Sequence, residues 1–159
     1  MIKICIYREP LRLSESSYRR KSTKKASNPP SERSLARSRA SLMDLCMCND
    51  FDLFCTFTFD PKRYNSKSIL SCKSYMNTWI RNAKERHSKN LKYLIIPELH
   101  KSGAIHFHAL FKNYEGRLRE SGIFQNGRQV FNIPYWHFGF STCCKIDNIE
   151  HVSRYISKY

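Results

Sequence analysis

The chain has 159 residues and a formal charge of +15, from 28 Lys or Arg and 13 Asp or Glu. This size suits one domain with a tail, and the charge exceeds what an enzyme of a neutral metabolite needs and is typical of a protein that handles a polyphosphate. Apolar residues, 41% of the chain, can form a core, but no apolar run approaches the roughly 18 residues of a membrane span, so we expect a cytoplasmic protein with no membrane partner.

The N-terminal part is rich in basic residues. Residues 8–41 contain ten basic and three acidic side chains together with Pro29-Pro30. Such a segment is either a solubilising tail or an arm that binds phosphates, and the basic charge of the rest of the chain favours the arm. We therefore divide the chain into a basic, partly flexible segment over residues 1–30 and a folded domain over residues 31–159.

Hydrophobic periodicity and turn residues predict the remaining elements in chain order. They are a helix from Ser31 to about Cys48, a strand over residues 54–59, a helix from Ser68 to about His87, strands over 92–98 and 104–111, a hairpin over 122–131 with its turn at Asn126-Gly127, a strand over 137–146, and a last helix capped by Asp147 with Glu150 in a capping box. This order is an α+β plan, with a central antiparallel sheet, helices packed on one face and the other face open.

The first predicted strand has two chemically different faces. Cys55, Phe57 and Phe59 alternate with Thr56 and Thr58. Because successive side chains of a strand point to opposite faces, the first set would be buried and the threonines would lie on a polar face.

The cysteines do not form a recognisable metal or disulfide pattern. There are seven of them, irregularly spaced and without a Cys-x-x-Cys pair. An odd, irregular set argues against a zinc ribbon and against a disulfide framework. We expect buried thiols in a reducing compartment.

The strongest chemical signal is His106-Phe107-His108. Two histidines separated by one residue on a strand point to the same face, so their imidazoles can share one divalent cation. The pattern alone is weak, since a pair of surface or hydrogen-bonded histidines is equally possible. The apolar residues Ile105, Phe107 and Ala109 occupy the alternate positions, which orients both histidines to the other face.

A carboxylate is expected beside the two histidines. If the turn between the two strands is centred on Ser102, Glu98 lies directly opposite His106, with Cβ atoms roughly 5 Å apart. Two imidazoles and one carboxylate would leave open positions for water and phosphate oxygens, as Mg²⁺ or Mn²⁺ requires. A one-residue slip would turn Glu98 to the wrong face, and His100 is the reserve ligand.

The last predicted helix carries two tyrosines. Tyr155 and Tyr159 are four residues apart and therefore neighbours on the helix surface. Such a pair is more often simple packing. Beside a phosphate-binding metal, however, a phenol oxygen can attack a phosphodiester and hold DNA as a covalent phosphotyrosine. Lys158 would then stabilise the phenolate or the phosphate, unless it is merely a solvated helix lysine.

Three segments together resemble the motifs of the HUH endonucleases, named for their His-hydrophobic-His group. Residues 93–110, with Glu98 and both histidines, resemble the metal-binding motif; residues 57–61 resemble the first motif; and residues 155–159 resemble the catalytic tyrosine motif. The nearest match is the two-tyrosine rolling-circle replication initiators of small single-stranded DNA phages and related plasmids.

The resemblance implies a function and a role for each site residue. Members nick one DNA strand at an origin, become attached to its 5′ phosphate and leave a free 3′ hydroxyl for a polymerase. Carried over, His106, His108 and Glu98 would bind Mg²⁺ or Mn²⁺; Tyr155 would be the nucleophile. Lys158 would be its partner and Tyr159 the second nucleophile, although Tyr159 ends the chain where family members generally continue the helix. The expected partners are single-stranded origin DNA and a host helicase and polymerase in a bacterial cell.

DNA contacts are expected from polar and basic residues. In this family the first strand should neighbour the histidine strand, so Thr56 and Thr58 would line the DNA track. Within residues 112–131, three arginines are candidates for phosphate binding: Arg117, Arg119 and Arg128. Four aromatic residues are candidates for base stacking, although each is more typical of packing: Tyr64, Tyr114, Tyr135 and Trp136.

Two other classes of protein remain open. A noncatalytic single-stranded nucleic-acid-binding module, built on a sheet of the RNA-recognition kind, would explain the charge and the fold but not the ligands with paired tyrosines. An HUH transposase or plasmid relaxase would share the same chemistry. The transposase usually has one tyrosine and a downstream glutamine, and the relaxase a tyrosine near the N-terminus, where Tyr7 and Tyr18 lie.

Overall fold

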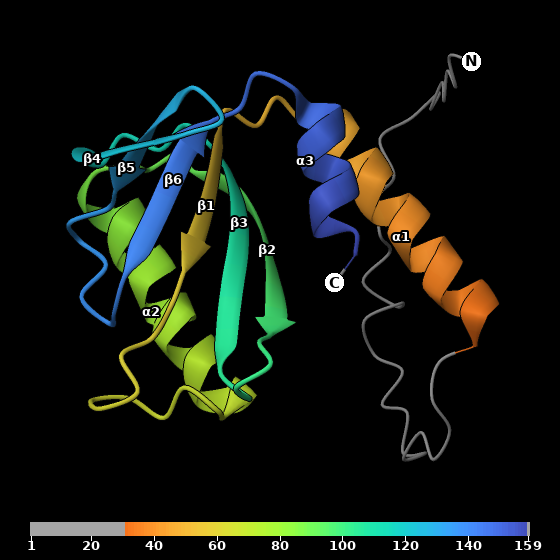
Figure 1. Cartoon of the computed structure of the whole chain (residues 1–159). Coiled ribbons are helices and arrows are strands. Elements are labelled where there is room, and N and C mark those ends of the chain that lie inside the picture. The colour runs from red at the N-terminus through yellow and green to blue at the C-terminus, as the bar shows by residue number, and fades with distance from the viewer. Residues whose placement is uncertain (1–30, 159) are drawn as a thin grey trace.

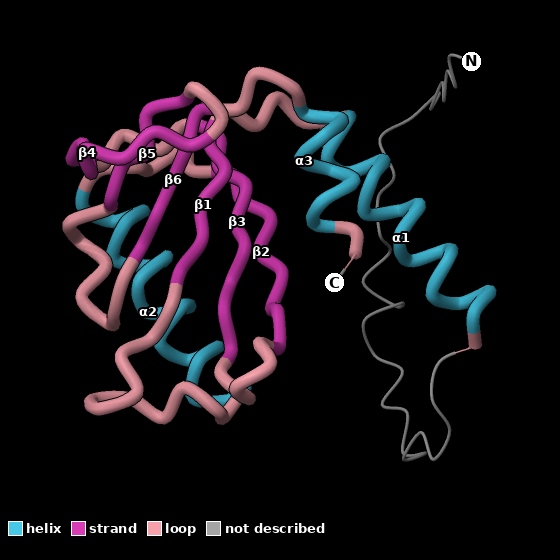
Figure 2. Tube along the Cα trace, viewed as in Figure 1, coloured by secondary structure: helices cyan, strands magenta, loops and turns pink. Residues whose placement is uncertain are grey.

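A six-stranded antiparallel sheet forms the centre of the domain (Figure 1). The structure, a computed structural model, describes residues 31–158; the predicted basic segment over residues 1–30 and Tyr159 lie outside the described residues. The elements, coloured by type in Figure 2, are α1 (Glu32–Met47), β1 (Leu53–Phe57), α2 (Ile69–Arg86), β2 (Lys92–Leu99), β3 (Ile105–Lys112), β4 (Arg119–Gln125), β5 (Arg128–Asn132), β6 (Ser141–Lys145) and α3 (Ile149–Ile156). None of these helices is long and apolar enough to span a membrane. The predicted α+β fold class is confirmed.

The sheet brings the first strand beside the histidine strand. The strand order is β2-β3-β1-β6-β5-β4, and each strand runs antiparallel to its neighbours. β1 therefore pairs with β3 on one side and with β6 on the other. Thr56 is the register partner of His108 in β3 and of Thr142 in β6.

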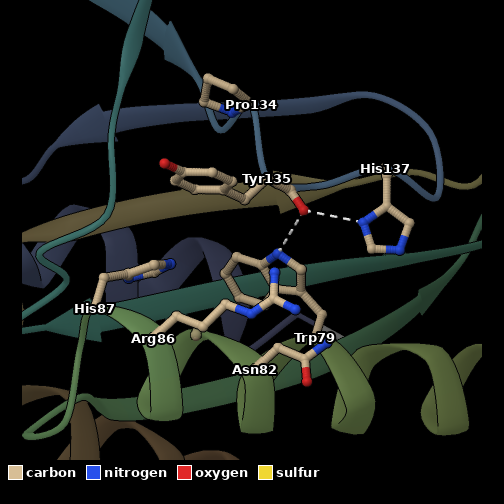
Figure 3. A pocket seen from close by; sticks show the side chains of 8 residues that line it. Trp79, Asn82, Arg86, His87, Pro134, Tyr135 and His137 are labelled. Carbon is tan, nitrogen blue, oxygen red and sulfur yellow. Dashed lines mark hydrogen bonds between the residues drawn. The ribbon is translucent and has the colours of Figure 1, made fainter.

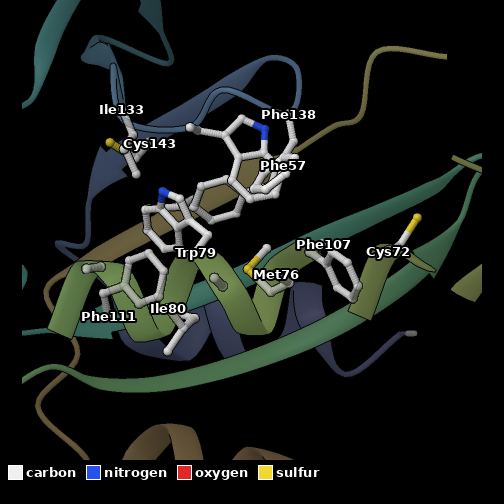
Figure 4. Packing of buried hydrophobic residues seen from close by; sticks show 14 of the residues in the cluster. Phe57, Cys72, Met76, Trp79, Ile80, Phe107, Phe111, Ile133, Phe138 and Cys143 are labelled. Carbon is white, nitrogen blue, oxygen red and sulfur yellow. The ribbon is translucent and has the colours of Figure 1, made fainter. Parts of the chain in front are cut away.

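One face of the sheet packs on α2 and forms the main core. The side chains of Cys55 and Phe57 in β1 and of Trp79 in α2 are buried there (Figure 4). The Phe57 ring lies 5.1 Å from Trp79 and 4.7 Å from Trp136, centroid to centroid. Because burying one large apolar side chain contributes about 1.5–3 kcal/mol, this aromatic cluster is a main source of the domain's stability.

The opposite face is not open, which corrects the prediction that all helices pack on one face. α1 and α3 lie side by side there, and Cys46 of α1 and Ile156 of α3 pack with Leu110 of β3. Phe54 of β1 belongs to the same cluster. β1 and β3 thus carry apolar side chains on both faces at this end, and the second pair of helices removes them from water.

The helix α3 begins one residue later than predicted. Asn148, not Asp147, is the N-cap, and its side chain accepts a hydrogen bond of 3.0 Å from the backbone N–H three residues on. Asp147 instead forms an ion pair with Arg128, 2.6 Å between Oδ2 and Nη2. Glu150 pairs with Arg154 one turn further along rather than closing a capping box.

The hairpin turn at Asn126-Gly127 is confirmed. The two residues have φ angles of 51° and 74°, the left-handed pair that a two-residue type I′ turn requires. Asn tolerates this conformation and Gly adopts it without a steric penalty, so the turn is encoded locally. The hairpin projects its tip toward the face of the sheet that α3 partly covers.

The strand predicted over residues 137–146 is shorter, because residues 133–140 form a loop that returns to the core. Trp136 is buried, and its indole N–H donates a 3.0 Å hydrogen bond to the carbonyl of Thr58. A Cβ at Gly139 would lie 2.3 Å from that same carbonyl oxygen. The loop therefore depends on a residue without a side chain at its point of closest approach to β1.

The cysteines in the described residues are free thiols, as predicted. Burial raises the pKa of Cys46 to about 11 and also raises the pKa of Cys55, which packs against Cys143. Thiols with raised pKa values are poor nucleophiles, so these side chains serve as small apolar core residues.

Candidate active site

An open cleft of about 670 Å³ lies on the face of the sheet opposite α2. Its residues come from β1, β2, β3 and β6, from the β4–β5 turn and from α3: Phe54, Thr56, Glu98, His100, His106, His108, Gln125, Asn126, Arg128, Thr142, Cys143, Cys144, His151, Val152 and Tyr155. Five of the predicted site residues, from the histidine motif, the carboxylate, one threonine and one tyrosine, are therefore in one place.

His106 and His108 both face this cleft, as the two-residue period of a strand predicts. His108 is the more buried of the two, with 4% of its surface exposed. The Thr56 hydroxyl lies 3.1 Å from His108 Nδ1, and the Phe54 ring stacks on the imidazole at 5.7 Å. The orientation of His108 is thus held from β1 on two sides.

Glu98 lies on the predicted face but contacts the other histidine. The register pairs Glu98 with His106, as expected. Its Oε2 atom nevertheless lies 2.6 Å from Nε2 of His108, two residues further along β3. With its proton on Nε2, His108 donates to this carboxylate and accepts from the Thr56 hydroxyl, so both ring nitrogens are hydrogen-bonded.

His106 is paired with the predicted reserve ligand. The rings of His106 and His100 stack in parallel, 5.0 Å between centroids and 7° between planes. Burial first, and then the neighbouring His100, lower the pKa of His106 below its ordinary value, while Glu98 opposes the shift. The neutral imidazole, which is the form that binds metals, is therefore favoured.

The donors suit a divalent cation, but they contact one another. Two imidazoles and one carboxylate are a sensible ligand set for Mg²⁺ or Mn²⁺. Among residues 31–158, however, no three His, Cys, Asp or Glu side chains are gathered closely enough to hold an ion. Glu98 would have to leave Nε2 of His108 for all three donors to converge. The chemistry of the donors fits, and metal binding stays a prediction.

Tyr155 reaches the cleft from α3. Its ring meets His108 edge to face at 5.4 Å and Phe54 edge to face at 5.8 Å. Tyr155 is 39% exposed, so a molecule in the cleft can reach it. The helix is held in place by Ile156, which is buried between the sheet and α1. The predicted meeting of the tyrosine with the histidine strand is therefore present.

The two other predicted catalytic residues are less closely placed. Lys158 does not line the cleft, but its Nζ lies 5.7 Å from the centroid of the Tyr155 ring. A cation over an aromatic face is attracted to it and also raises the local positive potential. Tyr159 lies outside the described residues, so its predicted role is not tested.

The predicted DNA-binding residues separate into three groups. Thr56 and Arg128 line the cleft. Thr58 lies two residues further along the chain from Thr56, in an adjoining hollow with Phe140, and its hydroxyl donates to the Phe140 carbonyl at 3.1 Å. Arg117 and Arg119 are exposed in and just before β4, away from the cleft lining. Their role in DNA binding stays a prediction.

Three of the four aromatic candidates for base stacking are core residues. Trp136 is 4% exposed, and Tyr64 and Tyr114 pack against the main core. Tyr135 alone among the four is exposed, at 50%. Composition could not separate these residues, because the same aromatic side chains fill cores and bind bases.

Sequence reasoning missed several residues of the cleft. The hairpin turn contributes Gln125 and Asn126, α3 contributes His151, and Asp147 holds Arg128 in place through its ion pair. The Asn-Gly dipeptide predicted the turn but not its position, because the pairing of β5 with β6 decides where the tip lies. No local signal carries that information.

The comparisons with known proteins identify one family. Residues 52–159 match the family model described as replication-associated protein ORF2. No curated protein and no solved structure shows a significant match. The match covers more than half of the chain and includes all six strands, α2, the histidines of the cleft and α3. The chain therefore belongs to the family of the replication-associated protein ORF2.

Proposed function

We propose that the protein is a metal-dependent endonuclease and strand transferase that nicks single-stranded DNA at a specific site and rejoins it, to initiate rolling-circle replication. The family supports a role in replication initiation. The observation that carries the finer proposal is the ring contact of Tyr155 with His108, 5.4 Å between centroids, in one open cleft. It brings a candidate nucleophile to a candidate metal ligand.

Tyr155 is the proposed nucleophile. Its phenol oxygen attacks the scissile phosphorus, forming a bond from oxygen to phosphorus while the bond to the 3′ oxygen breaks. The phenol loses its proton to solvent, and the departing 3′ oxygen gains one. The DNA remains attached through its 5′ phosphate. Attack of a 3′ hydroxyl on this phosphotyrosine reverses the step, releases the phenol and rejoins the strand.

His106, His108 and Glu98 are the proposed metal ligands. A bound Mg²⁺ or Mn²⁺ would polarise the scissile phosphate and offset the charge that develops on it. Thr56 and Phe54 would orient the His108 ring, as their contacts do in the structure. A ligand that is held by its neighbours loses little freedom on binding a metal.

The remaining predicted residues have supporting roles in the proposal. Lys158 would offset the charge of the Tyr155 phenolate, and Tyr159 would be the second nucleophile that allows the displaced strand to be cut and circularised. Arg128 and Thr56, from opposite sides of the cleft, would contact the DNA backbone. Half or more of protein–DNA hydrogen bonds go to the backbone, which positions the strand without reading its sequence.

The proposal also names the setting of the reaction. The substrate is single-stranded origin DNA of a small phage or plasmid, in the cytoplasm of a bacterial host. A host helicase would unwind the duplex, and a host polymerase would extend the free 3′ hydroxyl. The charge of +15 supports binding to the DNA backbone.

A second candidate function is a noncatalytic module that binds single-stranded DNA. It is supported by the direct bond between Glu98 and His108, because this bond keeps the three metal donors from converging. In that case the charge and the cleft would serve binding alone. Cleavage separates the two candidates.

The test uses end-labelled single-stranded oligonucleotides that tile the replicon encoding the protein, incubated with Mn²⁺. We expect one oligonucleotide to be nicked and to give a protein–DNA adduct that survives a denaturing gel, and chelator to abolish both. Tyr155→Phe should lose the adduct, whereas the control Tyr93→Phe, an exposed tyrosine of β2, should keep it. His106→Ala should lose cleavage and retain much of the binding.

The outcomes distinguish the candidates. Cleavage that persists in Tyr155→Phe would move the nucleophile to Tyr159 or end the covalent mechanism. Binding without a nick under Mg²⁺ and Mn²⁺ would favour the noncatalytic module. A nick without any adduct would indicate hydrolysis by water instead.

A further inference from the structure

A second hollow, of about 350 Å³, lies on the α2 side of the domain, away from the cleft (Figure 3). It opens between the C-terminal half of α2 and the loop that leads into β6. The lining consists of Trp79, Asn82, Ala83, Arg86, His87, Pro134, Tyr135 and His137. The hollow thus combines aromatic surfaces with hydrogen-bonding groups and a cation.

The side chain that dominates the mouth of this hollow is an exposed aromatic. Tyr135 is 50% exposed, although the aromatic residue that follows it, Trp136, is buried in the core. The Tyr135 ring stacks on His87 at 5.3 Å with 24° between the planes. Figure 3 shows His87 and Arg86 rising from α2 toward Tyr135. A planar ring so supported offers its open surface to another planar group.

The hollow is preformed because its loop is anchored through the main chain. The carbonyl oxygen of Tyr135 accepts two hydrogen bonds of 3.2 Å, from the indole N–H of Trp79 and from Nδ1 of His137. Trp136 adds a third anchor by donating to the carbonyl of Thr58 at 3.0 Å. An aromatic surface that is already in position loses little entropy when it binds a ligand.

The hollow is connected to the cleft by a chain of surface depressions. His137 lines this hollow and also a neighbouring one that contains Thr58 and Phe140. Thr58 follows Thr56, a residue of the cleft, by two positions at the end of β1. Two strand residues span roughly 7 Å, about the length of one nucleotide of an extended strand. A polymer leaving the cleft along β1 would therefore reach Tyr135.

The charge along this route suits a phosphate backbone. Arg63 lines the intermediate depression and Arg86 lines the hollow. The nearby carboxylates are engaged or peripheral: Asp60 accepts a 2.9 Å bond from the backbone N–H of Lys62, and Glu115 acts on His87 from outside the lining. Arginines beside an aromatic surface are the usual components of single-strand binding grooves.

We propose that Tyr135 and His87 form a stacking subsite for one unpaired base of a DNA strand whose scissile phosphate lies in the cleft, with Arg86 contacting the adjoining phosphate. This inference rests on the proposed function for the identity of the polymer. It assigns to the α2 side of the domain a part in holding the substrate, several nucleotides from the reacting phosphate. Stacking is tolerant of sequence, so the subsite would add affinity rather than base specificity.

The first experiment measures binding in chelator, where no nicking can occur. Fluorescence anisotropy with oligothymidines of about 4 and about 16 nucleotides compares a probe that fills the cleft alone with one that can also reach Tyr135. Tyr135→Ala should weaken binding of the longer probe at least about fivefold and leave the shorter one unchanged. Tyr93→Ala, a tyrosine of similar exposure on β2, is the matched control and should change neither.

Two further variants guard against a folding defect. Tyr135→Phe keeps the ring and should bind the longer probe like the wild type. Arg86→Gln should weaken the longer probe and reduce the salt dependence of binding, whereas the control Lys84→Gln, on the same helix outside the hollow, should do so less.

The second experiment locates the base directly. The longer oligonucleotide with 5-iodouracil at single positions is irradiated in the complex, and the crosslinked peptide is identified by mass spectrometry. Crosslinks to residues 133–138 or to His87 are expected. Binding of both probes that is equally sensitive, or insensitive, to Tyr135→Ala, with crosslinks confined to the cleft, would overturn the subsite. Because neither experiment requires cleavage, a protein that never nicks DNA can still pass both tests, and a protein that nicks can fail them.

Discussion

Glu98 and His108 are joined by a 2.6 Å contact between Oε2 and Nε2, although the strand register places Glu98 opposite His106. The carboxylate therefore reaches diagonally across two strands to the more buried imidazole. Diagonal neighbours in an antiparallel pair are within reach of long side chains, and Glu is long enough. The contact links β2, the edge strand, to the centre of the candidate site.

Glu98→Gln is expected to weaken binding of Mn²⁺ at least about tenfold, which corresponds to about 1.4 kcal/mol. The amide keeps the shape of the side chain but removes the negative charge that a hard cation prefers. Titration calorimetry with Mn²⁺ measures the affinity without any DNA. Glu120→Gln, an exposed carboxylate of β4 outside the cleft, is the control. Equal affinities for wild type and Glu98→Gln would remove Glu98 from the ligand set.

Thr56→Val is expected to change the protonation of His108 and to reduce nicking about tenfold or more, because a group that orients a metal ligand is lost. Thr56→Ser retains the hydroxyl and should restore both properties. The ring nitrogen shifts of His108, measured by NMR, report which nitrogen carries the proton. Thr58→Val removes the neighbouring threonine hydroxyl, which bonds to Phe140, and should leave these shifts unchanged. Identical His108 spectra in Thr56→Val and wild type would show that the hydroxyl has no such role.

Gly139→Ala is expected to lower the free energy of unfolding by about 1–3 kcal/mol. The added Cβ would lie 2.3 Å from the carbonyl oxygen of Thr58 and 2.8 Å from the backbone nitrogen of Asp60, and backbone atoms cannot move aside cheaply. Urea denaturation measures the loss. Gly122→Ala has open space around its Cβ but a φ of +74°, so it should show only the smaller conformational cost of about 1 kcal/mol. A smaller loss for Gly139→Ala than for Gly122→Ala would contradict the close approach.

Tyr114→Phe is expected to leave the unfolding free energy unchanged or to raise it by about 1–3 kcal/mol. The Tyr114 hydroxyl is buried and has no hydrogen-bond partner among the residues described here, so its removal ends an uncompensated desolvation. Ser88→Ala is the contrasting variant, because Ser88 is buried but bonded to His87 Nδ1 at 2.7 Å and to the backbone N–H of Glu115 at 3.0 Å. It should destabilise the domain. A substantial loss in Tyr114→Phe would reveal a partner for the phenol.

The same tyrosine should make stability sensitive to alkaline pH. Burial first, with the neighbouring thiols of Cys55 and Cys143, raises the pKa of Tyr114 above its ordinary value of 10. A phenol whose pKa is higher in the folded than in the unfolded state stabilises the fold fully below pH 10 and loses that contribution as the pH rises further. The difference in unfolding free energy between Tyr114→Phe and wild type should therefore grow above pH 10 in favour of the variant. A difference that is constant with pH would show that the phenol titrates normally.

The local pattern of the chain determined which side chains share a face. The two-residue period of a strand places His106 beside His108 and Thr56 beside Thr58, and the turn at Gly103, with a φ of +81°, sets Glu98 opposite His106. These are properties of neighbouring residues, so the α+β class, the hairpin turn and the histidine face follow from sequence alone.

Only the tertiary structure decided which of those faces meet. The diagonal reach of Glu98, the packing of α3 that carries Tyr155 to His108, and the position of Arg128 all depend on pairings between distant segments. So does the division of the aromatic residues into a buried Trp136 and an exposed Tyr135, adjacent in the chain. Backbone periodicity encodes the direction of a side chain, whereas its partner is selected by the long-range fit of the whole sheet, which no short segment contains.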